Sequence, residues 1–99
     1  MEDATVFEVT QFVEPALEPG QRYQGADETS LGTFEEEAEA IAVGRAAWEA
    51  HRAADTADVA WWLVRVPGEP LARWIADSRS QFERVLDLTT QQLVEVKTP

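Results

Sequence analysis

The sequence predicts an α+β protein of two layers, in which one helix packs on a mostly antiparallel sheet of four or five strands. Three observations support this fold class. Residues 59–66 form an apolar run, which the turn sequence Pro67-Gly68-Glu69-Pro70 connects to a second apolar run at residues 71–78. Residues 5–13 alternate apolar and polar side chains, as a half-buried strand does. Residues 35–52 repeat apolar side chains at helical spacing. The expected order is strand, helix, strand, strand, strand.

The N-terminal strand is expected to place Phe7, Val9 and Val13 on one face and Phe12 on the other. Two prolines and a glycine within residues 14–20 end that strand. Residues 25–32 are polar and contain glycine at both ends, so they are expected to form a loop.

The helix is expected to begin at a capping box, in which the Thr33 hydroxyl accepts from the amide of Glu36 and the Glu36 carboxylate accepts from the amide of Thr33. Gly44 lies in mid-helix at a cost of about 1 kcal/mol relative to alanine, which indicates close packing against the sheet or against a partner's helix. Arg45 falls on the apolar stripe. Either its stem lies along the sheet with the guanidinium emerging at the edge, which we favour, or it pairs with a carboxylate from a strand.

The central hairpin holds three of the four tryptophans. Pairing Val66 with Leu71 would place Trp62 and Ile75 on the face that packs against Trp48 of the helix. The same pairing would place Trp61, Leu63 and Trp74 together on the opposite face. Aromatic side chains beside arginine are typical of protein–protein anchors. The predicted interaction face therefore comprises Trp61, Leu63, Trp74, Arg65 and Phe12, unless the N-terminal segment covers it.

A last hairpin is expected from residues 84–88 and 92–97. We choose a three-residue loop, 89–91, because it separates apolar from polar side chains best. This loop requires a positive φ at Gln91 or its neighbour, at a cost of about 1 kcal/mol.

The charge of the chain limits the possible partners. Nineteen acidic against eight basic residues give a net charge of −11, which disfavours nucleic acid and fits a basic partner or simple solubility. The chain has no cysteine, which excludes disulfides and thiolate metal sites. No window is apolar enough for membrane insertion, and we do not expect the acidic N-terminus to be a signal peptide. We expect one domain, residues 1–99, in the cytoplasm.

Catalytic or metal chemistry finds little support in the sequence. His51 is the only histidine, and its place near the end of the predicted helix is explained by the helix dipole. No motif supplies it with a nucleophile. The acidic clusters lack calcium-loop spacing. We therefore expect no cofactor, no metal and no enzymatic activity.

The helix opening Thr33-Phe34-Glu35-Glu36, together with a compact sheet, resembles small antitoxin-type domains that have a partial double-stranded-RNA-binding fold. The predicted strand order differs from theirs, so no residue's role is carried over. More broadly, the chain is similar to short actinobacterial proteins of unknown function, a resemblance that implies no activity. From the residues we expect an interaction module that self-associates or docks a protein through its aromatic face. The alternative is a small-molecule-binding or accessory subunit.

Overall fold

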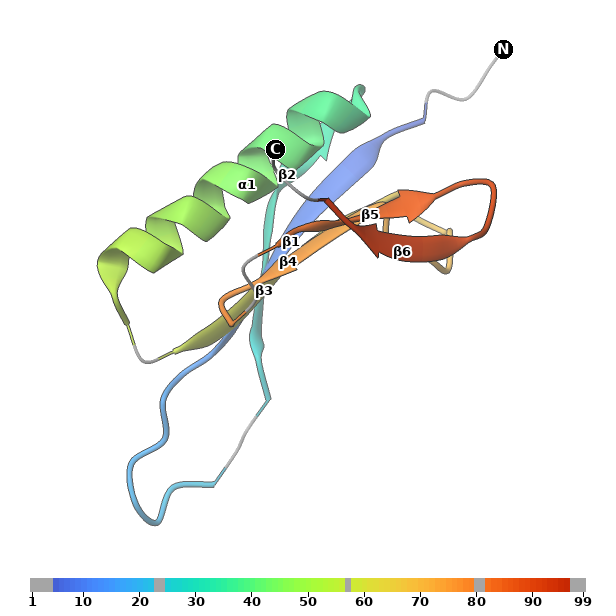
Figure 1. Cartoon of the computed structure of the whole chain (residues 1–99). Coiled ribbons are helices and arrows are strands. Elements are labelled where there is room, and N and C mark those ends of the chain that lie inside the picture. The colour runs from blue at the N-terminus through green and yellow to red at the C-terminus, as the bar shows by residue number, and fades with distance from the viewer. Residues whose placement is uncertain (1–4, 23–24, 57, 80–81, 97–99) are drawn as a thin grey trace.

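The computed structural model describes residues 5–22, 25–56, 58–79 and 82–96. Within these ranges it forms two layers, one helix on a six-stranded antiparallel sheet (Figure 1), which confirms the α+β prediction with more strands than expected. The elements are β1 (Phe7–Glu14), β2 (Asp27–Phe34), α1 (Glu37–Ala54), β3 (Val59–Arg65), β4 (Trp74–Asp77), β5 (Arg84–Asp87) and β6 (Gln92–Glu95). The strands lie side by side in the order β2-β1-β3-β4-β5-β6.

Strand β2 is the element that the sequence did not reveal. Its residues, Asp-Glu-Thr-Ser-Leu-Gly-Thr-Phe, were expected to be a loop and the start of the helix, but they pair antiparallel with β1 from Asp27 to Phe34. As an edge strand it keeps its first four residues exposed, so it needs few apolar side chains. A register shift opposite Val9 and Thr10, next to Gly32 at φ 130°, bends the strand.

The capping box is wrong because Thr33 belongs to β2. The helix begins at Glu37 with Glu36 as its N-cap residue, and no side chain caps it. The expected acidic first turn remains, since Glu37 and Glu39 lie where the helix dipole favours negative charge. At the other end, the Asp55 amide donates to the Arg52 carbonyl in a left-handed C-cap.

Large aromatic side chains fill the space between helix and sheet. Trp62, Trp74 and Val64 are fully buried and Trp48 is nearly so, so the expected pairing of Trp48 with Trp62 in one core is confirmed. Gly44 lets the helix approach the sheet: a Cβ atom built there would lie 2.6 Å from Cζ3 of Trp74. Of the two roles considered for this glycine, close packing on the sheet is therefore the one the structure shows.

The predicted pairing of the central hairpin is wrong by one residue. Val64 pairs with Trp74, and Leu63 pairs with Ile75. Because side chains alternate along a strand, a shift of one residue exchanges the faces of every side chain in β4. Trp74 therefore lies under the helix beside Trp62, and Ile75 lies on the opposite face.

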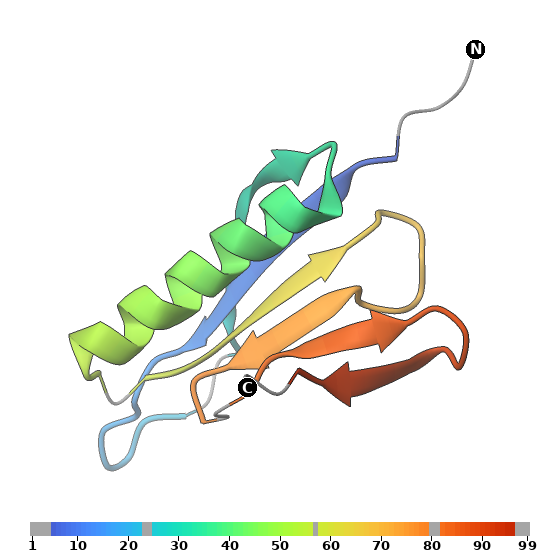
Figure 2. The same cartoon turned by 45° about the horizontal axis from the view of Figure 1, so that its top comes forward.

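The C-terminal hairpin also differs from the expected register. Leu86 pairs with Leu93 and Asp87 with Gln92, so the loop has four residues, 88–91, and not three. The expected positive φ at Gln91 is confirmed at 59°. The Asp87 carboxylate stabilises the turn by accepting from the Thr89 amide. This hairpin extends beyond the part of the sheet that α1 covers (Figure 2).

Candidate protein-interaction face

The sheet face away from α1, called the open face below, carries a row of apolar side chains. Phe12 of β1 pairs with Trp61 of β3, and their rings stack with centroids 5.3 Å apart and planes 11° apart. Next to them Leu63 lies between Thr10 and Ile75 on the neighbouring strands. Flat stacked rings on a sheet give a rigid surface that loses little side-chain entropy when it is covered.

The structure brings together four of the five side chains predicted for the interaction face. Alternate residues of β3 point to the same face, so the open face carries Trp61, Leu63 and Arg65. Phe12 joins them because it lies directly opposite Trp61 in β1. Trp74 does not belong to this face. It is fully buried beneath Gly44, and Ile75 takes its place next to Leu63.

The Pro-rich segment after β1 is itself exposed to solvent. Residues 15–22 are exposed throughout and form part of the wide connection from β1 to β2, which projects from the sheet (Figure 1). Leu17, the segment's largest apolar side chain, is 51% exposed. Phe12 stacks on Trp61 from within the sheet. Tyr23, the other large side chain expected to be able to cover Trp61, lies outside the described residues.

Ion pairs flank the apolar row on two sides. The Arg65 Nε lies 3.6 Å from Glu8 Oε1, and an Arg84 nitrogen lies 4.0 Å from Glu95 Oε1. All four side chains are between about one quarter and one half exposed, so these pairs contribute little to stability. They do neutralise charge around the apolar row.

Thr10 is an unusual residue at the centre of the open face. It is 2% exposed, and its Oγ1 has no hydrogen-bond partner in the described part of the chain. A buried hydroxyl without a partner costs about 1–3 kcal/mol. The hydroxyl does not stabilise the fold, so stability does not explain why threonine occupies this position.

Charge is divided unevenly between the two halves of the chain. Residues 1–58, which include β1, β2 and α1, contain fourteen acidic and three basic residues and so carry the whole net charge of −11. Residues 59–99, which include β3 to β6, contain five of each and are neutral. The sheet therefore runs from an acidic edge at β2 to a neutral edge at β6. Counting the two halves of the sequence separately would have revealed this division.

On the helix side, Glu83 connects three parts of the fold. Its carboxylate accepts a hydrogen bond of 3.0 Å from Trp74 Nε1 and is paired with the Arg45 guanidinium. The hydrogen bond from Arg45, aided by the one from Trp74, lowers the pKa of Glu83 below its ordinary value, although burial acts in the opposite direction. Arg45 thus pairs with a carboxylate just before β5 while remaining 47% exposed. The pairing was the less favoured of the two interpretations.

His51 lies at a small polar cleft of about 370 Å³ at the end of α1. Its ring meets Trp62 edge-on at 5.5 Å, and its Nε2 is buried without a hydrogen-bond partner among the described residues. Two other groups that line the cleft have structural roles. The Ser78 hydroxyl accepts from the Ala60 amide, and the Asp58 carboxylate accepts from the Ala16 amide. Among the described residues, no hydrogen bond therefore links His51 to a nucleophile.

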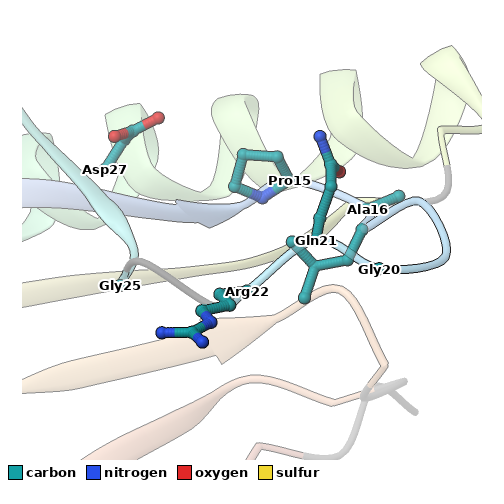
Figure 3. A pocket seen from close by; sticks show the side chains of 8 residues that line it. Pro15, Ala16, Gly20, Gln21, Arg22, Gly25 and Asp27 are labelled. Carbon is teal, nitrogen blue, oxygen red and sulfur yellow. The ribbon is translucent and has the colours of Figure 1, made fainter.

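A larger hollow of about 660 Å³ lies within the connection between β1 and β2 (Figure 3). Its charged lining side chains are Arg22, in the loop, and Asp27, the first residue of β2, and Figure 3 shows them apart from one another. Its volume falls within the range of small-molecule sites, but most of the residues that line it are exposed and lie in the loop.

The described residues hold neither a metal-binding cluster nor a membrane-spanning helix. No group of three or more potential metal ligands lies together in that part of the chain. None of its helices is long and apolar enough to cross a membrane. No family model, curated protein or solved structure matches the chain.

Proposed function

We propose that the chain is a protein-interaction module that docks a partner protein through the open face. The observation that carries this proposal is the stacked pair Phe12 and Trp61, continued by Leu63 and Ile75 on a sheet face that α1 does not cover. Aromatic side chains at the centre of a patch with arginine at its rim are the usual energetic anchors of protein interfaces.

The charge distribution adds to the chemistry expected of the partner. A partner that covers the open face would also lie close to the β2 edge of the sheet, where Asp27 and Glu28 are exposed. We therefore expect it to combine an apolar contact surface with basic groups at one side. The absence of cysteine in the chain fits the reducing cytoplasm as the place of this interaction.

The test compares variants of the open face with a matched control. Trp61→Ala removes the largest side chain of the row, whereas Leu17→Ala removes an exposed apolar side chain outside it. Partners captured from the organism of origin by the wild-type chain should be retained by Leu17→Ala. Trp61→Ala should weaken their binding at least about thirtyfold, as the loss of an anchor worth about 2 kcal/mol does. Equal binding by both variants, each shown to be folded by circular dichroism, would contradict the proposal.

A small-molecule-binding role is the second candidate, favoured by the volume of the hollow in the β1–β2 connection. A ligand at one hundred times its Kd would add about 2.7 kcal/mol to stability. A thermal-shift screen of metabolites against the wild type and Arg22→Ala would detect such a ligand and show whether this hollow binds it. No shift with the wild type across a broad panel would count against this role.

A further inference from the structure

The β6 edge of the sheet is less protected than the β2 edge. Edge strands carry unpaired backbone groups, which proteins guard with charged side chains, bulges or proline. Strand β2 has exposed Asp27 and Glu28 and a register shift next to Gly32. Strand β6 is regular, and its one charged side chain, Glu95, is paired with Arg84 of the neighbouring strand.

The hairpin that contains β6 also exposes apolar side chains on both of its faces. Leu93 on the open face is 40% exposed, and Val94 on the helix side is 45% exposed because α1 does not reach it. The chain as a whole exposes 6978 Å², about 1,300 Å² more than a compact monomer of 11.1 kDa.

The hydrogen-bond pattern of the hairpin shows which backbone groups of β6 face outward. The Val96 amide donates to the Glu83 carbonyl, and pairing alternates along an antiparallel ladder. Val94 and Gln92 therefore direct their backbone groups toward β5. Leu93 and Glu95 direct theirs away from the sheet, where they are available to another strand.

We propose that β6 pairs antiparallel with β6 of a second copy of this chain, which extends the sheet across a two-fold axis perpendicular to it. In this arrangement Leu93 of each copy exchanges backbone hydrogen bonds with Glu95 of the other, and the two Val94 side chains meet at the axis. The alternative register, centred on Leu93, would bring Gln91 into the pairing. Gln91 has a φ of 59° and is not extended, so the register centred on Val94 gives the longer overlap.

The charge distribution favours a second copy over a charged partner at this edge. The neutral half of each chain would meet the neutral half of the other, and Glu95 would lie opposite Leu93 and not opposite another carboxylate. The acidic halves would lie at the two far ends of the joined sheet. Since neighbouring strands are about 4.8 Å apart, the two helices would be separated by several times the Debye length of about 8 Å at physiological salt.

Pairing of two short strands buries less than the roughly 800 Å² per partner of a standard interface, so we expect a dimer with a micromolar Kd. In sedimentation equilibrium, the average molecular mass should rise from that of a monomer to that of a dimer as the protein concentration increases through the micromolar range. Val94→Asp places two like charges at the axis without removing a buried side chain, so it should stay folded and raise the Kd at least tenfold. A wild type that stays monomeric at millimolar concentration would overturn the proposal.

Cross-linking tests the register, because the wild-type chain has no cysteine. Facing residues of a non-hydrogen-bonded pair have Cα atoms about 4.5 Å apart, within disulfide range. Val94→Cys should therefore form a disulfide-linked dimer under mild oxidation. Leu93→Cys, which faces Glu95 of the second copy, and Leu88→Cys, in the loop and 60% exposed, should cross-link at least tenfold more slowly. Equal rates for Val94→Cys and either control would overturn it.

The two proposals of partner binding can fail separately. Trp61 lies on a different surface, so Trp61→Ala should leave dimerisation unchanged. If Trp61→Ala abolished the dimer and Val94→Asp left it intact, the chain would self-associate through the open face. That result would overturn the β6 pairing.

Discussion

Replacing Gly44 with alanine tests how closely the helix is held to the sheet. The added Cβ would lie 2.6 Å from Trp74 Cζ3 and 3.1 Å and 3.3 Å from two further atoms of the same ring. The ring has little room to move aside, because Trp74 is fully buried and its Nε1 donates to Glu83. Either the helix shifts outward or the ring leaves its position.

Two opposing effects set the size of the change. Alanine is favoured over glycine within a helix by about 1 kcal/mol, whereas overpacking of a rigid core costs about 1–3 kcal/mol. Because three ring atoms crowd the new Cβ, we place the packing cost near the upper end of that range. The expected net loss is about 1–2 kcal/mol of unfolding free energy, which lowers the Tm by about 4–15 °C in a domain of this size.

Chemical and thermal denaturation of Gly44→Ala, followed by circular dichroism, would measure this loss. Ala46 lies on the exposed side of the same helix, so Ala46→Gly measures the helix-propensity contribution without any contact to Trp74. The packing cost is the sum of the two destabilisations. A Gly44→Ala variant as stable as the wild type or more stable would refute the argument that the Trp74 ring fixes the helix–sheet distance.

Three other changes have expected outcomes. Because the folded-state pKa of Glu83 is lowered, its pairing with Arg45 stabilises the fold above the pKa of the unfolded chain, and this contribution is lost as the pH falls through the folded-state pKa. Glu83→Gln should therefore lower the unfolding free energy at pH 7 by about 1 kcal/mol, a small effect because Arg45 is half exposed. The difference in unfolding free energy between variant and wild type should shrink in acid. Denaturation curves that give the same difference at every pH would contradict this. Thr10→Val should raise the unfolding free energy by up to about 1–3 kcal/mol, because it removes a buried hydroxyl without a partner, and a destabilised variant in the same assay would show that the hydroxyl is satisfied. Trp61 is the only one of the four tryptophans that is not buried, so Trp61→Phe should abolish most of the acrylamide-quenchable fluorescence; unchanged quenching would mean that a core tryptophan is accessible.

The parts of the fold that carry a strong local pattern were predictable from the sequence. Strands β1 and β3 and the helix have the required periodicity. The positive φ at Gln91 was also predicted, although the length of its loop was not. Strand β2 could not be predicted, because an exposed edge strand needs no apolar alternation and its Asp-Glu-Thr-Ser start resembles a loop. Thr33, near the end of this strand, has the sequence context of a helix cap, which led to the wrong helix start.

The misplacement of Trp74 has a different physical origin. The sequence between β3 and β4 contains two prolines and a glycine but does not determine how many residues the turn uses. Two apolar faces in β4 gave no signal to choose between registers that differ by one residue, because both Trp74 and Ile75 can be buried. In the structure the Trp74 ring packs directly against Gly44, where a Cβ would not fit, but a glycine in the sequence does not indicate which side chain lies opposite it.

The uneven charge of the chain has a consequence for how the molecule approaches other surfaces. Because β1, β2 and α1 are acidic and β3 to β6 are close to neutral, the molecule has a permanent dipole, and the field of a positively charged surface turns it before contact. The β2 end would lead and the β6 end would trail. A pair joined at β6 would then be a rod with two like-charged tips and a neutral middle, suited to span two positive surfaces at once.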